Sequence, residues 1–165
     1  MRAALVVLAS YAVGCVVGAY YIVRLRTGRD VRLTGSGNAG ARNVLRSGDT
    51  TSAVLTFLWD AAKGALAVWA ADRLLPNDWI GGVAFLFVLA GHIWPAQLGF
   101  RGGKGVATAM GCTLTLALIG RSWPNVLAVA IAWTLVMIAH RPAFERHRKS
   151  LGGDGLATPT RENGT

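Results

Sequence analysis

The sequence predicts an all-α, polytopic membrane protein. Hydrophobic residues make up 53% of its 165 residues and charged residues only 15%, whereas about a quarter of a soluble domain is charged. The charges are clustered between long apolar stretches, and backbone inside hydrocarbon has to satisfy its own hydrogen bonds, which favours helices. Five helices are therefore expected, over Ala3–Val23, Thr50–Ala71, Trp79–Leu98, Val106–Gly120 and Trp123–Ala139.

The first stretch is long enough to cross a bilayer, because about 20 helical residues cover the ~30 Å hydrocarbon core. No small-residue cleavage site follows it, so an uncleaved span is expected in place of a secretory signal. The fourth and fifth stretches are short for complete spans. Residues 1–149 are expected to form one transmembrane domain, and the polar, glycine-rich residues 150–165 a disordered cytoplasmic tail.

Basic residues are distributed unevenly between the two sides of such a bundle. If five helices alternate in direction, thirteen basic residues fall on one side and three on the other. Cytoplasmic loops carry the excess of Lys and Arg, so the sequence predicts an N-terminus outside and cytoplasmic loops. The net charge of +9 is then a topology and headgroup signal, and no nucleic-acid partner is expected. The three residues on the sparse side are Arg2, Arg73 and Arg121.

The first of two glycine-rich basic loops covers residues 35–46, with the sequence GSGNAGARNVLR. Glycines allow backbone N–H groups to approach a ligand closely, and arginine pairs with phosphate through charge-assisted hydrogen bonds. The loop is therefore predicted to bind a phosphate, the alternative being that its arginines only set topology. The residues that carry this prediction are Gly35, Gly37, Gly40, Ser36, Asn38, Asn43, Arg42 and Arg46.

The spacing Gly35-x-Gly37-x-x-Gly40 also fits the dinucleotide-binding fingerprint. No strand pattern precedes it, and Asp60, at the distance of the acidic residue in that fingerprint, lies inside an apolar helix. A Rossmann site is therefore rejected. The cysteines and histidines show no metal-ligand spacing, so neither a metal nor a cofactor is expected.

The second basic loop joins the third and fourth predicted helices and contains GFRGGKGVAT at residues 99–108. A helix that begins near Val106 points its first N–H groups toward an anion. The loop is not a Walker A motif, since glycine follows its lysine. His92 lies about one turn before the preceding helix ends; it is a packing residue or a functional one, and two phosphate-suited loops favour function. The other candidate binding residues here are Gly102, Gly103, Lys104, Gly105 and Thr108.

Two charged residues, Asp60 and Lys63, interrupt the second predicted helix. Each costs about 2.5–3.5 kcal/mol near the bilayer centre, and their i, i+3 spacing allows an ion pair on one helix face. A structural pair and a ligand contact are equal alternatives. After the fifth helix, residues 140–149 form a basic amphipathic stretch that is expected to contact lipid headgroups.

Two long motifs, GSGNAGARNVLR and GHIWPAQLGFRGGKGVAT, stand in order at residues 35–46 and 91–108, with Asp60-x-x-Lys63-Gly64 between them. This pattern resembles the bacterial acyl-phosphate-dependent glycerol-3-phosphate acyltransferases, the PlsY family. The resemblance covers roughly residues 5–115. It implies a multi-pass plasma-membrane enzyme that transfers a fatty acyl group from acyl phosphate to the 1-hydroxyl of sn-glycerol 3-phosphate, giving lysophosphatidic acid and phosphate.

The same resemblance implies which residues meet the two phosphate-bearing substrates. Ser36, Gly37, Asn38, Asn43 and Arg46 belong to its first motif, and the second motif contributes His92, Gly102, Gly103, Lys104, Gly105 and Thr108. The expected partners are acyl phosphate, glycerol 3-phosphate and membrane lipids.

The mechanism that these residues suggest is positioning and charge neutralisation of two phosphates. Arg46 and Lys104 are expected to supply the main charges, one on each loop. His92 is a candidate general base, unless a phosphate oxygen of the substrate takes the proton. Ser36 is the weaker candidate for a covalent nucleophile, because no base is visibly paired with it.

The chain departs from the family pattern at two positions. Arg42 stands where the family has threonine, and Ala143 stands where its third motif has asparagine. Two other functions therefore stay open: a non-catalytic member that binds glycerol 3-phosphate or lipid phosphate, and a small anion transporter. Transporters commonly contain inverted repeats, and no internal repeat is evident in this sequence.

Overall fold

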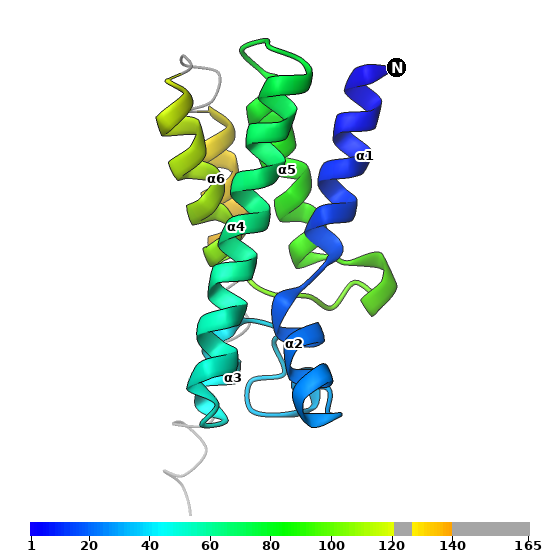
Figure 1. The fold of residues 1–165 in the computed structure, drawn as a ribbon, viewed down its shortest axis with the longest axis vertical. Coiled ribbons are helices and arrows are strands. Elements are labelled where there is room, and N and C mark those ends of the chain that lie inside the picture. The colour runs from blue at the N-terminus through cyan, green and yellow to red at the C-terminus, as the bar shows by residue number, and fades with distance from the viewer. Residues whose placement is uncertain (121–126, 140–165) are drawn as a thin grey trace, which may run out of the picture.

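In the computed structural model, all regular secondary structure of the described residues, 1–120 and 127–139, is helical, and no strand occurs there. This confirms the predicted all-α fold (Figure 1). The predicted tail and the basic stretch before it lie outside the described residues. In chain order the elements are α1 (Arg2–Cys15), α2 (Gly18–Thr27), the 3-10 turn η1 (Val31–Leu33), α3 (Ala41–Arg46), α4 (Thr50–Leu74), α5 (Ile80–Ile93), the 3-10 turn η2 (Ala96–Leu98), α6 (Val106–Ile119) and a helix over Leu127–Ala139.

Three segments are long and apolar enough to cross a membrane: Arg2–Thr27, Thr50–Leu74 and Ile80–Leu98. They correspond to the first three predicted spans. Two further apolar helices, Val106–Ile119 and Leu127–Ala139, are shorter, as their sequences predict. Large apolar side chains such as Leu8 and Leu58 are exposed on the outside of the bundle, which is the arrangement expected where helices face lipid.

The structure differs from the prediction within the first span, which is two helices and not one. Helix α1 ends at Cys15, Val16 and Val17 leave the helical conformation, and α2 begins at Gly18. Irregular backbone at membrane depth is tolerated only where it is buried in protein or lines a polar cavity. The groups that satisfy this break come from α4 and from the segment after α5, so the break could not be foreseen from the first span alone.

The bundle is held together by close contacts between helix backbones. Helix α1 packs along α5, and α4 packs along α6 and α5. At the α1–α5 crossing Gly14 faces Gly91, and a Cβ atom added to Gly14 would lie 3.0 Å from the Gly91 Cα atom. At the α4–α6 crossing a Cβ atom on Gly111 would lie 3.1 Å from the Ala61 Cα atom. Small residues at such crossings let membrane helices associate through van der Waals contact.

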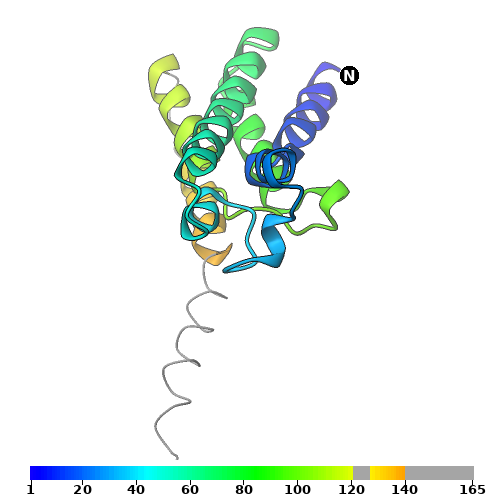
Figure 2. The same ribbon diagram turned by 60° about the horizontal axis from the view of Figure 1, so that its bottom comes forward.

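The core has one main apolar cluster between α4, α5, α6 and Leu127–Ala139, which includes Val68, Phe85 and Cys112. A second cluster, with Val17, Val31 and Val44, lies below it between α2, α3 and the first glycine loop. Helices α5 and α6 run alongside the C-terminal half of α4, whereas α2 and α3 lie beside its N-terminal half, and both glycine loops gather on that side of the bundle (Figures 1 and 2).

The arginines are also distributed between the two ends of the bundle. The arginines of the first loop lie at the end where α2 and α3 are, while Arg2 begins α1 and Arg73 lies in the last turn of α4, at the opposite end (Figure 1). The two predicted loops therefore share one side of the molecule, as the alternation of spans requires.

Candidate active site

The first glycine loop is shaped by the side chain of Asn43, which is 3% exposed. Its Oδ1 atom accepts hydrogen bonds from the backbone N–H of Ser36 at 2.8 Å and from the Ser36 hydroxyl at 3.0 Å. Its Nδ2 atom donates to the carbonyl oxygens of Val31 and Thr34, both at 3.0 Å. Both amide protons of Asn43 are therefore used inside the loop. A Cβ atom on Gly35 would collide with Asn43 Oδ1, so glycine is required there.

The remaining predicted residues of this loop are more accessible. Arg42 and Arg46 are exposed, and Ser36, Asn38 and Gly40 are partly buried. Gly37 is exposed with φ 70°. In this loop, then, one buried side chain maintains the backbone shape while two arginines extend from it. That arrangement leaves charged donors available to an anion.

The two glycine loops meet directly, although about sixty residues separate them. The backbone N–H of Ala39 donates to the carbonyl oxygen of Gly102 at 3.3 Å. Arg32 adds a second link, because its Nη1 atom donates to the carbonyl oxygens of Leu98 at 2.7 Å and Arg101 at 3.5 Å. The structure therefore brings the two sequence motifs together into one site.

Arg32 is a residue that sequence reasoning counted only as a topology signal. Its guanidinium pairs with the Asp30 carboxylate at 2.7 Å and lies 4.9 Å from the centre of the Tyr20 ring. The hydrogen bonds from Arg32 hold the pKa of the Asp30 carboxyl below its usual value of 3.8. No distinctive motif surrounds this pair, so its role as a latch between the loops had no signal in the sequence.

The second glycine loop folds back on the end of α5. Gly102 donates from its backbone N–H to the Ile93 carbonyl oxygen at 3.1 Å, and Gly103 to that of His92 at 3.0 Å. A Cβ atom on Gly103 would collide with His92 Nε2 and lie 2.8 Å from the Ala39 carbonyl oxygen. Gly103 therefore lies where α5 and both loops meet.

The rest of the second motif leads into α6. Lys104 is partly buried, and Gly105 precedes the helix with φ 81°. Thr108 lies in the first turn and is fully buried. Its hydroxyl finds no hydrogen-bond partner among the residues that the structure describes.

A buried polar cluster of Asp60, Lys63 and His92 lies behind the loops, each residue at most 4% exposed. Lys63 Nζ lies 2.8 Å from Asp60 Oδ1 and 2.9 Å from His92 Nδ1. Of the two alternatives for Asp60 and Lys63, a structural pair is the one that these contacts support. Lys63, also predicted to bind substrate, has its ammonium surrounded by protein atoms.

This cluster supplies hydrogen-bond partners for the backbone groups at the break between α1 and α2. The Gly18 N–H donates to Asp60 Oδ1 at 3.2 Å, and Lys63 Nζ donates to the carbonyl oxygens of Gly14 at 3.1 Å and Val16 at 2.9 Å. Two residues that sequence reasoning missed contribute as well. Trp59 donates to the Val16 oxygen at 3.0 Å, and Gln97 donates to that of Cys15 at 2.6 Å.

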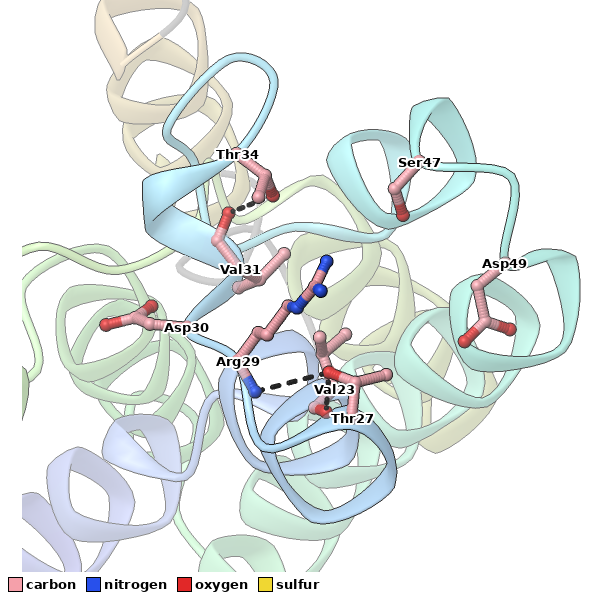
Figure 3. A pocket seen from close by; sticks show the side chains of 8 residues that line it. All are labelled: Val23, Thr27, Arg29, Asp30, Val31, Thr34, Ser47 and Asp49. Carbon is pink, nitrogen blue, oxygen red and sulfur yellow. Dashed lines mark hydrogen bonds between the residues drawn. The ribbon is translucent and has the colours of Figure 1, made fainter.

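Two pockets open near the loops. The larger, of about 360 Å³, lies between the end of α2, η1 and the link from α3 to α4, and the Arg29 side chain extends into it (Figure 3). No residue predicted for the site lines it; its walls are Val23, Thr27, Arg29, Asp30, Val31, Thr34, Ser47 and Asp49. The smaller, of about 210 Å³, lies between η1 and the segment from η2 to Arg101, and is lined by Asp30, Arg32, Leu33, Leu98 and Arg101.

Comparison with known proteins agrees with this geometry. The profile of the family described as glycerol-3-phosphate acyltransferase matches residues 4–144. The chain belongs to this family. It is 43% identical over 141 residues to the glycerol-3-phosphate acyltransferase of Bordetella avium (strain 197N), which covers 84% of this chain and 64% of that protein. With the enzyme of Synechococcus sp. (strain CC9902) it shares 47% identity over 118 residues, or 72% of this chain and 56% of the relative. The chain thus spans less than two thirds of these relatives' length.

Solved structures of the family have the same fold. The crystal structure of PlsY (YgiH), an integral membrane glycerol 3-phosphate acyltransferase, in its glycerol 3-phosphate form superimposes with a TM-score of 0.75 at 25% identity, covering 97% of both chains. The lysophosphatidic acid form gives 0.73 and covers 93% of both. The protein is therefore a multi-pass membrane protein of this family.

Proposed function

We propose that this protein transfers a fatty acyl group from acyl phosphate to the 1-hydroxyl of sn-glycerol 3-phosphate. The observation that carries the proposal is the direct contact of two glycine-rich basic loops at one end of a membrane bundle, through Ala39 and Gly102. A membrane-embedded acyl donor and a polar acceptor both carry a phosphate, and such a junction suits both. Family membership supports the same reaction.

The reaction requires positioning more than chemical activation. The acceptor hydroxyl oxygen attacks the acyl carbon, a new ester bond forms, and the bond from the acyl carbon to the phosphate oxygen breaks. Phosphate leaves with the electron pair, and the hydroxyl proton passes to a base. Holding two phosphates near each other in a site of low dielectric requires charge neutralisation, which preorganised donors supply.

Arg46 and Lys104 are proposed as the principal charges, one from each loop. Arg46 is exposed on the loop that Asn43 shapes, and Lys104 lies partly buried between Gly103 and the start of α6. The remaining proposed contacts to substrate come from the same two loops and from the first turn of α6: Gly35, Ser36, Gly37, Asn38, Gly40, Gly102, Gly103, Gly105 and Thr108. Asn43 and Lys63, which were also predicted to bind substrate, are proposed to support these residues from behind.

Ser36 is proposed to bind substrate without forming a covalent intermediate. Its hydroxyl donates to Asn43 Oδ1 at 3.0 Å, and an amide oxygen does not act as a general base at neutral pH. A serine nucleophile needs a neighbouring base to remove its proton. The contact therefore favours direct transfer between the two substrates.

The proposed location is the cell membrane, with both motif loops cytoplasmic and the N-terminus outside. The concentration of arginines at the loop end of the bundle supports this orientation through the positive-inside rule. Cysteine introduced at Arg46 or at Arg2 and labelled with a membrane-impermeant reagent in intact cells tests it. Labelling of the Arg46 position from outside would reverse the proposed topology.

The activity is tested with purified protein in lipid, palmitoyl phosphate and labelled glycerol 3-phosphate. Wild-type protein is expected to form labelled lysophosphatidic acid, while Arg46→Ala and Lys104→Ala each lower kcat/KM by about 100-fold or more. Arg73→Ala, at the opposite end of the bundle, serves as the matched control and retains activity. Near-normal turnover in both loop variants would refute the proposed site.

A binding-only family member is the second candidate, favoured by Ala143 at the position of the family's third-motif asparagine. The same preparation separates the two functions. Folded wild-type protein that binds glycerol 3-phosphate, measured by calorimetry, but forms no product would establish binding without turnover.

A further inference from the structure

The two ring nitrogens of His92 lie in different surroundings. Nδ1 faces the buried pair, 2.9 Å from Lys63 Nζ and 3.5 Å from Asp60 Oδ1. Nε2 faces the other way, toward Gly103, at the junction of the two glycine loops. Which nitrogen carries the proton therefore decides whether His92 presents a hydrogen-bond donor or an acceptor at Nε2.

Lys63 determines that choice. An ammonium group only donates hydrogen bonds, and the other three atoms around Lys63 Nζ are all acceptors: Asp60 Oδ1 at 2.8 Å, Gly14 O at 3.1 Å and Val16 O at 2.9 Å. The fourth neighbour is His92 Nδ1, so three N–H groups serve four atoms and one N–H is shared; Nδ1 meets this cation favourably only through its lone pair. A proton on Nδ1 would point at an N–H group only 2.9 Å away.

The alternative arrangement fits the distances less well. A proton on Nδ1 could be donated only to Asp60, whose oxygen at 3.5 Å lies beyond the 2.7–3.2 Å range of N–H to oxygen hydrogen bonds. Turning the ring over would place a carbon against the ammonium and lose the 2.9 Å contact. The neutral imidazole therefore carries its proton on Nε2.

The Nε2 proton is directed at the place where both loops converge. His92 is 2% exposed, and among the described residues the polar contacts of its ring are all made by Nδ1, with Lys63 at 2.9 Å and Asp60 at 3.5 Å. Nε2 itself has no hydrogen-bond partner among the described residues, so its proton is available to an acceptor from outside the protein. Here it lies against Gly103, beside the Ala39 carbonyl that a Gly103 side chain would also meet.

We propose that His92 acts as a neutral hydrogen-bond donor, through Nε2–H, to an oxygen of the phosphate-bearing substrates at the loop junction. Asp60 and Lys63 are the positioning residues that hold this tautomer. The inference rests on the proposed acyltransferase function and refines it. In the transfer step the ester bond forms, the bond to phosphate breaks and the hydroxyl proton moves to a phosphate oxygen, while the His92 proton stays on Nε2.

This role differs from general base catalysis, which requires a lone pair on Nε2. A donor aimed at a developing negative charge contributes about 10²–10³-fold when it is preorganised. The two roles respond differently to substitution, because a glutamine side chain places an N–H group near the Nε2 position without being basic. An asparagine side chain reaches only to the Nδ1 position.

The kinetic test therefore compares His92→Gln, His92→Asn and His92→Ala in the acyl-transfer assay. We expect His92→Gln to retain kcat within about tenfold of wild type, and His92→Asn and His92→Ala to lose about 100-fold or more. A glutamine variant that folds and is as inactive as the alanine variant would overturn the donor role.

A measurement on the wild-type protein does not depend on turnover. Nitrogen NMR of protein labelled at its three histidines, His92, His140 and His147, distinguishes the two neutral tautomers and the imidazolium. The signals missing from His92→Gln identify His92. A proton on Nε2 alone supports the inference, and a proton on Nδ1 overturns it. If wild-type protein gives no product, the proposed function fails while the tautomer is still decided.

Discussion

Two charged regions of this molecule lie close together and behave in opposite ways. In the cluster of Asp60, Lys63 and His92, every residue is buried and the charged groups bond to one another and to backbone. In the first glycine loop, Arg42 and Arg46 are exposed. The cluster uses its charge to hold a broken helix, whereas the loop leaves its charge available to an anion. The difference shows that the contacts of a charged residue, and not its residue type, decide whether it holds the fold together or is available to a ligand.

The largest effect is expected from removing the cation of the cluster. Lys63→Met leaves the Asp60 carboxylate buried without its partner, together with the carbonyl oxygens of Gly14 and Val16. Breaking a buried pair from one side costs about 3–5 kcal/mol. Denaturant unfolding in detergent should show a loss of this size.

The matched control is Arg73→Met, which removes a cation that lies 5.7 Å from the Trp69 ring at an exposed position. Its cost should be about 0.5–1 kcal/mol. The double variant Asp60→Leu/Lys63→Met is expected to be more stable than Lys63→Met alone, because it removes both charges. Equal stability of the Lys63 and Arg73 variants would contradict the role assigned to the cluster.

The next largest effect is expected on activity, from a substitution where the glycine loops contact the buried cluster. Gly103→Ala introduces a Cβ atom that collides with His92 Nε2 and crowds the Ala39 carbonyl oxygen, so one loop has to move relative to the other. A displacement near 1 Å can lower activity about 100-fold. We expect kcat/KM to fall by this amount while the helical circular dichroism spectrum is retained.

Gly99→Ala is the control for this substitution. Gly99 has φ 63°, and a Cβ atom there meets nothing within 4 Å. This variant carries backbone strain of about 1–2 kcal/mol without a steric collision at the site. Activity that falls equally in both variants would mean that any perturbation of this loop lowers activity, and that the contact with His92 has no special role.

The smallest effect is expected on stability, at the Asp30–Arg32 ion pair that links the loops. Arg32 holds the pKa of Asp30 below its usual value, so the ionised carboxylate stabilises the folded protein above pH 3.8. That contribution is lost as the pH falls through the lowered pKa. Asp30→Asn should cost about 1 kcal/mol at pH 7 for this partly exposed pair.

The pH dependence supplies the check on that prediction. The stability difference between wild type and Asp30→Asn, followed by thermal unfolding, should shrink below pH 3.8 and disappear in stronger acid. High salt should reduce it at pH 7, because a partly exposed pair is screened. A difference that stays constant with pH would show that Asp30 acts through packing alone.

The sequence was sufficient for the positions of the three long apolar spans and of the two loops. Hydrophobicity and charge are local properties, and a stretch such as Thr50–Ala71 excludes most alternatives to a buried or lipid-facing helix. The glycine and arginine content of residues 35–46 and 99–105 likewise indicated phosphate-suited loops. Asn43 shows the limit of this approach, because its residue type suggested a ligand while both of its amide protons are bonded within the loop.

By itself, the sequence determined a membrane bundle of the glycerol-3-phosphate acyltransferase type with two basic glycine loops on one side. Only the tertiary structure decided where the first span breaks, that Lys63 and Asp60 satisfy that break, and that Arg32 joins the loops. The physical reason is that each of these features depends on partners far away in the chain: Val16 on Lys63, Gly18 on Asp60, and Leu98 on Arg32. A hydrogen bond needs both partners in place, and their meeting is a property of the fold.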